Sequence, residues 1–149
     1  MWVSPGPSAI ADPAAAEAVV FGARAALDAE GALAAGPSGA SGRRLVVRIV
    51  ALEESTAGIV LSEGRPVGRG SRLVLRGEAT LEASPSGGSE RWEATVAEAV
   101  GPRGDAVAEL RSRDDALREL GRNLGGELAR RALGTSGRAP GRMWYGLAP

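Results

Sequence analysis

Two stretches of the chain repeat apolar residues at the three- and four-residue spacing of an amphipathic helix. The first spans residues 11–31, where Asp12 is a suitable N-cap and Pro13 a suitable first helical residue. Gly31 is expected to end it, because glycine adopts the left-handed conformation that terminates many helices. The pattern therefore predicts one N-terminal helix with an apolar face.

The second helical stretch is residues 112–133, with Ser112 or Asp114 as its expected cap and Gly134 as its stop. Its predicted buried stripe consists of Leu117, Leu120, Leu124 and Leu128. Gly121 and Gly125 lie beside this stripe. Each glycine costs about 1 kcal/mol of helix stability relative to alanine, so we expect both to permit close packing against a sheet.

Between the helices, apolar and polar residues alternate in the two-residue period of β-strands. Strands are predicted over residues 43–52, 71–83 and 90–100, and "WVSPG" near the start predicts a short first strand. Residues 53–70 are predicted to form a loop.

The alternation also predicts which side chains share a face. In the first long strand, Ala51 is expected on the face of Leu45, Val47 and Ile49, and Leu52 on the other face. The next two strands are expected to form an antiparallel hairpin. A symmetric turn between them would place Trp92 beside Leu81 and Arg91 opposite Glu82.

The element order is (β)-α-β-β-β-α, which predicts an α+β fold. We expect a two-layer sandwich, with two helices packed on one face of a three- to four-stranded mixed or antiparallel sheet. The pattern predicts a single domain over residues 1–133 and a flexible C-terminal tail over residues 134–149.

The composition excludes several classes of function but does not identify one. The net charge is zero, which argues against a nucleic-acid binder that relies on bulk positive charge. The chain has no Cys, His or Lys, so thiol catalysis, Cys/His zinc sites, imidazole bases and Schiff-base chemistry are excluded. We expect no metal and no cofactor. An enzyme would have only carboxylates, hydroxyls and arginines for its chemistry.

No apolar run approaches the roughly 20 residues that span a bilayer. The first ten residues lack the basic start and apolar core of a signal peptide. Two interpretations follow: either the protein is cytosolic, or this chain begins after its export signal.

One stretch carries a concentration of arginine, namely Arg65, Arg69, Arg72 and Arg76. The glycines around them resemble a phosphate loop, but such loops lead into a helix, and this one leads into a strand. Arg72 and Arg76 should project from the strand face turned away from the helices, with Arg65 and Arg69 on the preceding loop. The four could bind the phosphates of a large anionic ligand through side chains. The alternative is a solvated strand end whose arginines protect a sheet edge.

The whole pattern resembles the LptE-type lipoproteins of lipopolysaccharide assembly. The resemblance rests on the short strand "WV", the helix, the strand "RLVVRIVAL", the hairpin and above all the closing helix "RDDALRELGRNLGGELARRAL". In this helix, Arg113, Ala116 and the four leucines of the predicted stripe match the family pattern.

The resemblance implies a non-enzymatic protein on the periplasmic side of the outer membrane. Its implied partners are an LptD-like outer-membrane β-barrel and lipopolysaccharide, whose phosphates Arg65, Arg69, Arg72 and Arg76 would bind. The family carries an N-terminal signal and a lipidated cysteine, and we expect this lipid anchor to be encoded upstream of Met1. The residues alone are also compatible with a periplasmic adaptor or activator domain that has a different protein partner.

Overall fold

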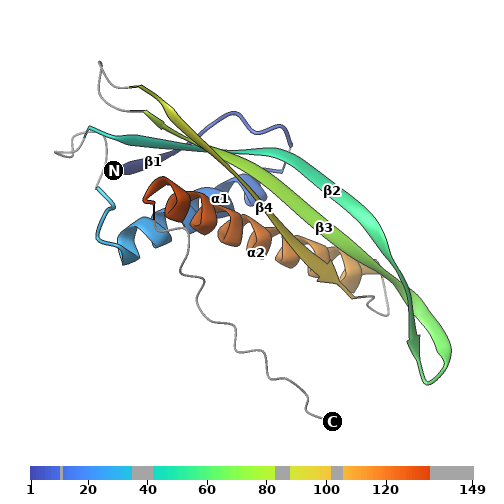
Figure 1. The fold of residues 1–149 in the computed structure, drawn as a ribbon. Coiled ribbons are helices and arrows are strands. Elements are labelled where there is room, and N and C mark those ends of the chain that lie inside the picture. The colour runs from blue at the N-terminus through green and yellow to red at the C-terminus, as the bar shows by residue number, and fades with distance from the viewer. Residues whose placement is uncertain (11, 35–41, 83–87, 102–105, 135–149) are drawn as a thin grey trace, which may run out of the picture.

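The computed structural model describes residues 1–10, 12–34, 42–82, 88–101 and 106–134, and for 57–62, 65–69 and 106 it describes the backbone alone. The elements follow the order β-α-β-β-β-α. Figure 1 shows two layers, with both helices on the same face of a four-stranded sheet. The fold is the two-layer α+β sandwich that the pattern predicts.

The sheet has the strand order β1-β2-β3-β4. The strands are β1 (Trp2–Pro5), β2 (Arg44–Ser62), β3 (Arg65–Glu82) and β4 (Glu90–Val100). The predicted short first strand is confirmed and pairs parallel with β2, whereas the β2–β3 and β3–β4 pairs are antiparallel. Parallel strands need a crossover connection, and α1 (Pro13–Ala29) lies within this one.

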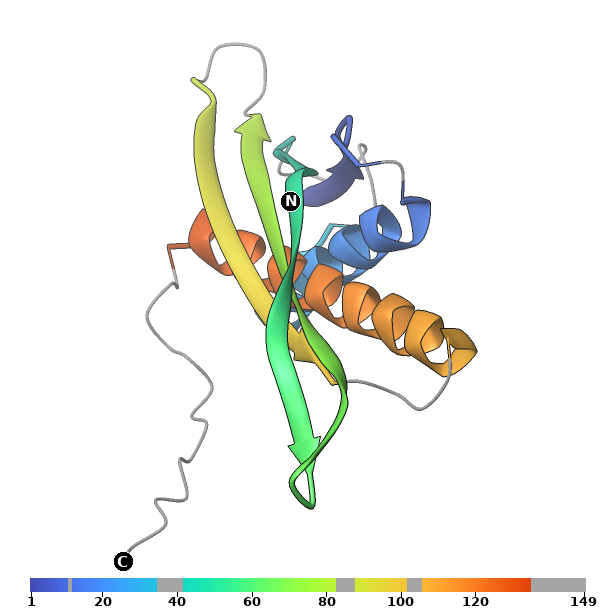
Figure 2. The same ribbon diagram turned by 90° about the vertical axis from the view of Figure 1, so that its right-hand side faces the viewer.

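β2 and β3 form one long hairpin, so the loop predicted over residues 53–70 is wrong. The ladder continues to Ser62 and Arg65 and closes at Glu63 and Gly64. Both turn residues have positive φ, 51° and 76°, as in the turns favoured by two-residue hairpins. Pairing of two strands through their main-chain groups does not require an alternation of apolar side chains. Figures 1 and 2 show the hairpin projecting past the helices.

A β-bulge at Val50 reverses which β2 side chains face the helices. Pairing with β3 skips one residue between Ile49 and Ala51. Beyond the bulge, Leu52 pairs with Leu75 and packs against the core. Ala51 therefore lies on the opposite face, which contradicts the face predicted for both residues. One extra residue changes the phase of a two-residue period.

β4 pairs with β3 two residues away from the predicted register. Trp92 was expected beside Leu81, and Arg91 opposite Glu82. The observed pairs are Ala79–Trp92 and Thr80–Arg91. A shift by two preserves the faces of both strands, so Trp92 still lies on the helix side and packs against the core.

The capping predicted for α1 is confirmed. The Asp12 carboxylate accepts a hydrogen bond of 3.0 Å from the Ala15 amide. Pro13 is the first helical residue. Gly31 has φ 64°, and its amide donates to the Asp28 carbonyl just past the helix end. These contacts satisfy main-chain groups that a helix end leaves without partners.

α2 (Ala106–Ala132) begins six residues earlier than predicted. Ser112 and Asp114, the expected caps, lie inside the helix. The additional turns carry no buried apolar stripe, since Val107 and Leu110 are about 60% exposed. The helix stop is confirmed: Gly134 has φ 71°, and its amide donates to the Arg131 carbonyl.

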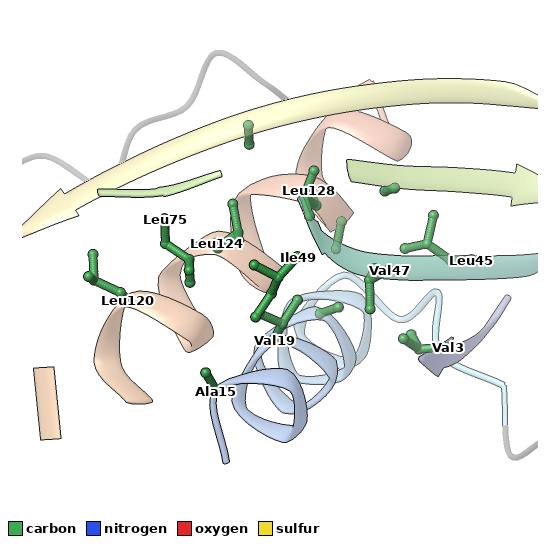
Figure 3. Close-up of a cluster of buried hydrophobic side chains, with 14 of the residues drawn as sticks. Val3, Ala15, Val19, Leu45, Val47, Ile49, Leu75, Leu120, Leu124 and Leu128 are labelled. Atoms are coloured by element: carbon green, nitrogen blue, oxygen red, sulfur yellow. The ribbon is translucent and has the colours of Figure 1, made fainter. Parts of the chain in front are cut away.

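The core lies between the helices and the sheet, as Figure 3 shows. The predicted stripe of α2 is fully buried there, with Leu117, Leu120, Leu124 and Leu128 at most 1% exposed. It packs with Leu and Val residues from both central strands and from α1. Among residues less than 2% exposed, the largest side chains are Leu27, Leu45, Ile49, Leu73, Leu75, Leu117, Leu120, Leu124 and Leu128.

The glycines of α2 pack against α1, not against the sheet as predicted. A Cβ at Gly121 would lie 2.8 Å from the Ala18 Cβ, and one at Gly125 would lie 1.9 Å from the Val19 carbonyl oxygen. From the other side, a Cβ at Gly22 would lie 2.1 Å from the Arg122 carbonyl oxygen. The two helix backbones therefore approach closely, and the leucine stripe of α2 packs in the core between the helices and the sheet.

Candidate functional site

The sheet face turned away from the helices, here called the outer sheet face, is polar. Alternation in β3 buries Leu73 and Leu75 on the helix side and leaves Arg72 and Arg76 exposed on the other side, as predicted. The described charged side chains of this face are Arg44, Arg48, Glu53, Arg72, Arg76, Glu78, Glu82, Arg91 and Glu93. Five are basic and four acidic, so the outer sheet face is close to neutral.

Glu78 lies at the centre of this face and is only 6% exposed. Its carboxylate lies 3.1 Å from the Arg48 guanidinium on β2 and 3.3 Å from the Arg91 guanidinium on β4. A buried carboxylate is costly unless it is paired, and here two neighbouring strands supply the partners. This three-residue ion cluster connects β2, β3 and β4 through their side chains.

A second charged group lies beside β1. Arg44 is 3.5 Å from the Glu82 carboxylate and donates a 2.8 Å hydrogen bond to the Ser4 hydroxyl. Its guanidinium also lies over the Trp2 ring, 5.0 Å from the ring centre. Arg44 therefore links β1, β2 and β3 at this end of the sheet.

The structure separates the roles of the two predicted strand arginines. Arg76 is half-exposed and lies 3.6 Å from the Glu53 carboxylate. Arg72 is exposed and has no ion pair among the described residues. Its cross-strand neighbours, Ser55 and Ala99, are small. Of the described pair, Arg72 is therefore the one available to an outside anion without competition from a carboxylate.

Arg65 and Arg69 were predicted on a loop, and that placement is wrong. Both belong to the paired part of β3, where Arg65 pairs with Ser62 and Arg69 with Ile59. Their side chains lie outside the described part of the structure. The structure thus places all four arginines along one strand rather than gathering them around a turn.

The ion cluster around Glu78 was not anticipated from the sequence, although a signal was present. Arg48 interrupts the apolar run of its strand, and Glu78 takes a polar position in the alternation of the next strand. The two residues are direct cross-strand partners. Recognising this pair requires the hairpin register, which the sequence does not specify.

The helix side of the sheet has its own polar contact. Arg113 of α2 lies 3.0 Å from the Glu54 carboxylate of β2. The pair lines a cavity of about 380 Å³ together with Ser71, Val100, Gly101, Glu109 and Leu110. It therefore connects the projecting part of the hairpin to the first half of α2.

The described residues contain no group of three or more acidic side chains able to hold a metal ion. Within the same residues, no helix is both long and apolar enough to cross a bilayer.

Comparison with known proteins gives a structural likeness. No protein-family model matches the sequence, and no curated protein matches it. The crystal structure of rare lipoprotein B from Shewanella oneidensis superposes with a TM-score of 0.50 at 13% identity, covering 91% of this chain and 96% of that chain. A putative lipoprotein from Caulobacter crescentus superposes with a TM-score of 0.55 at 13% identity, covering 88% and 90%. The chain thus shares its fold, over nearly its whole length, with two solved bacterial lipoproteins.

Proposed function

We propose that this chain is a non-enzymatic, LptE-like subunit that aids lipopolysaccharide delivery together with an outer-membrane β-barrel. In this proposal the protein is anchored by lipid to the outer membrane and faces the periplasm. Two lines of support agree. The sequence resembles the LptE-type lipoproteins in its element order and closing helix, and the solved structures that share its fold are named as lipoproteins.

The outer sheet face is the observation that carries the proposal. The helices cover one face of the sheet, while the other face presents paired charges around the buried Glu78. If a polar barrel wall covered this face, the charges around Glu78 would keep their partners. They would therefore avoid most of the desolvation penalty that an unpaired charge incurs. A neutral, polar face of this kind suits a wet barrel lumen better than it suits an apolar protein interface.

Co-purification and fractionation test the proposal directly. The full-length product should be recovered from outer membranes of the organism that encodes it, and a barrel protein should accompany it after mild detergent extraction. A protein that fractionates entirely with the cytosol would contradict the proposal. A different envelope partner would favour the adaptor or activator function instead.

Lipopolysaccharide binding should depend on the strand arginines. The double variant Arg72→Gln/Arg76→Gln should raise the dissociation constant about two- to thirtyfold, because each of the two exposed charge contacts contributes roughly 0.2–1 kcal/mol. Salt should weaken wild-type binding for the same reason. Titration calorimetry with purified lipopolysaccharide measures both effects. Folding should change little, since exposed substitutions stay within about 0.5 kcal/mol.

Two further variants separate specific binding from a solvated face. Glu53→Gln removes the carboxylate that pairs with Arg76, so it should strengthen binding. Arg24→Gln removes an exposed charge from α1, away from the outer sheet face, and should leave binding unchanged. Equal binding by the strand double variant and wild type would mean that these arginines only solvate the sheet.

A further inference from the structure

The two edges of the sheet differ in how their main-chain groups are satisfied. At the β1 edge, the Met1 amine donates to the Ala32 carbonyl, and the Ala34 amide donates to the Met1 carbonyl. Arg24 also donates to the Val3 carbonyl. β1 is only four residues long and ends in Pro5. A short, covered edge that ends in proline is protected against pairing with another strand.

The β4 edge lacks this protection over most of its length. β4 has 11 residues, contains no proline and pairs with β3 without a register shift. Figure 2 shows it at the margin of the sheet. The Arg131 guanidinium donates to the Glu93 carbonyl from α2. Because residues along a strand alternate in the direction of their main-chain groups, Thr95, Ala97 and Ala99 also direct theirs to the open edge. In the described part of the chain, these three have no hydrogen-bond partner there.

The open edge of β4 adjoins a groove that is large enough for side chains of another protein molecule. Its volume is about 940 Å³, and it runs between the last residues of β4 and the flank of α2. The β4 side is lined by Glu98, Ala99, Val100 and Gly101. A strand paired with β4 would lie at the usual spacing of about 4.8 Å, and the small side chains of Thr95, Ala97 and Ala99 would lie on the outer sheet face beside it.

The charges on the α2 side of this groove form a self-complementary pattern. Asp115, Arg118, Glu119 and Arg122 follow one another along the exposed flank of the helix, in the order acid, base, acid, base. Within one chain, Arg118 lies 3.1 Å from the Asp115 carboxylate and Arg122 lies 3.6 Å from the Glu119 carboxylate, so in a dimer these exposed pairs would be shared with the second helix. A second α2 running antiparallel, with its centre at residues 118–119, would bring Arg118 to Glu119 and Asp115 to Arg122, each pair occurring twice. A two-fold axis requires this kind of self-matching surface.

We infer that the β4 edge and the flank of α2 form a two-fold interface with a second copy of this chain. Two β4 strands pair antiparallel near Ala97 and join both sheets into one of eight strands. The two α2 helices then lie side by side across the axis, where helices usually pack 8–10 Å apart. In this dimer the outer sheet face remains exposed. The inference is independent of the proposed function, because it uses only the β4 edge and the flank of α2.

Self-association of the purified protein tests this arrangement. Sedimentation from about 1 µM to about 1 mM should show a monomer–dimer equilibrium. Ala97→Pro removes one outward amide, and proline is tolerated on edge strands, so the variant should fold and its dimer dissociation constant should rise at least about tenfold. In the wild type, hydrogen exchange at the Thr95, Ala97 and Ala99 amides should slow as protein concentration rises.

Charge reversal on the helix tests the register independently of strand folding. Arg118→Glu places like charges opposite each other twice across the axis and should weaken the dimer about tenfold or more. The double variant Arg118→Glu/Glu119→Arg restores opposite charges and should recover dimerisation. A wild-type chain that stays monomeric to the highest concentration overturns the inference, as does a dimer that Ala97→Pro leaves intact. A dimer sensitive to Ala97→Pro but not to Arg118→Glu retains the strand pairing and overturns the helix register.

Discussion

Replacing Leu124 by alanine should lower the free energy of unfolding by about 2–5 kcal/mol, the usual range for a fully buried leucine. Leu124 has no exposed surface, and its side chain lies over Gly77. A Cβ built at Gly77 would come within 2.7 Å of the Leu124 Cδ2 atom. Because glycine has no side chain that could move into the space, the cavity should stay largely open. Urea denaturation followed by circular dichroism measures the change.

Leu110 provides the control on the same helix. It is 63% exposed, so Leu110→Ala should change stability by no more than about 0.5 kcal/mol. If Leu124→Ala were as mild as Leu110→Ala, the stripe of α2 would not be packed against the sheet. That result would contradict the core described here.

Gly125→Ala should destabilise the protein even though alanine is the better helix former. The added Cβ would lie 1.9 Å from the Val19 carbonyl oxygen and 2.8 Å from the Ala23 amide nitrogen, both of which are backbone atoms. The helices would have to separate, and overpacking of this kind costs about 1–3 kcal/mol or more. This cost exceeds the roughly 1 kcal/mol that alanine gains over glycine in a helix. Thermal unfolding of the variant measures the net effect.

The adjacent Gly126 supplies a matched control. A Cβ there would meet nothing closer than the Arg130 guanidinium, at 3.6 Å. Gly126→Ala should therefore raise stability by up to about 1 kcal/mol through helix propensity alone. Opposite signs at neighbouring positions would establish that contact with α1, rather than helix propensity, determines the need for glycine at Gly125. Stabilisation by both substitutions would contradict the close approach of the α1 and α2 backbones at Gly125.

The sequence by itself determined two kinds of feature: the ends of a helix, which depend on local hydrogen bonding, and the side of each helix or strand that is buried. Asp12 and Gly31 delimit α1 through their own hydrogen bonding and backbone preference. The leucine spacing of α2 determined which of its sides is buried, and Leu73 and Leu75 determined that Arg72 and Arg76 face outward. These patterns also determined the element order, and with it the α+β class of the fold.

Only the tertiary structure decided the features that depend on how separate elements meet. The bulge at Val50 brings Leu52 to the core, and no local signal marks where a strand gains a residue. Residues 53–70 were predicted as a loop, but they form paired strands because main-chain hydrogen bonds hold the hairpin. Gly125 meets α1 instead of the sheet because the crossing of two helices brings their backbones together. Glu78 became the centre of an ion cluster because the strand register places it between Arg48 and Arg91. Each of these outcomes depends on contacts between segments distant in sequence, which a pattern along one segment does not contain.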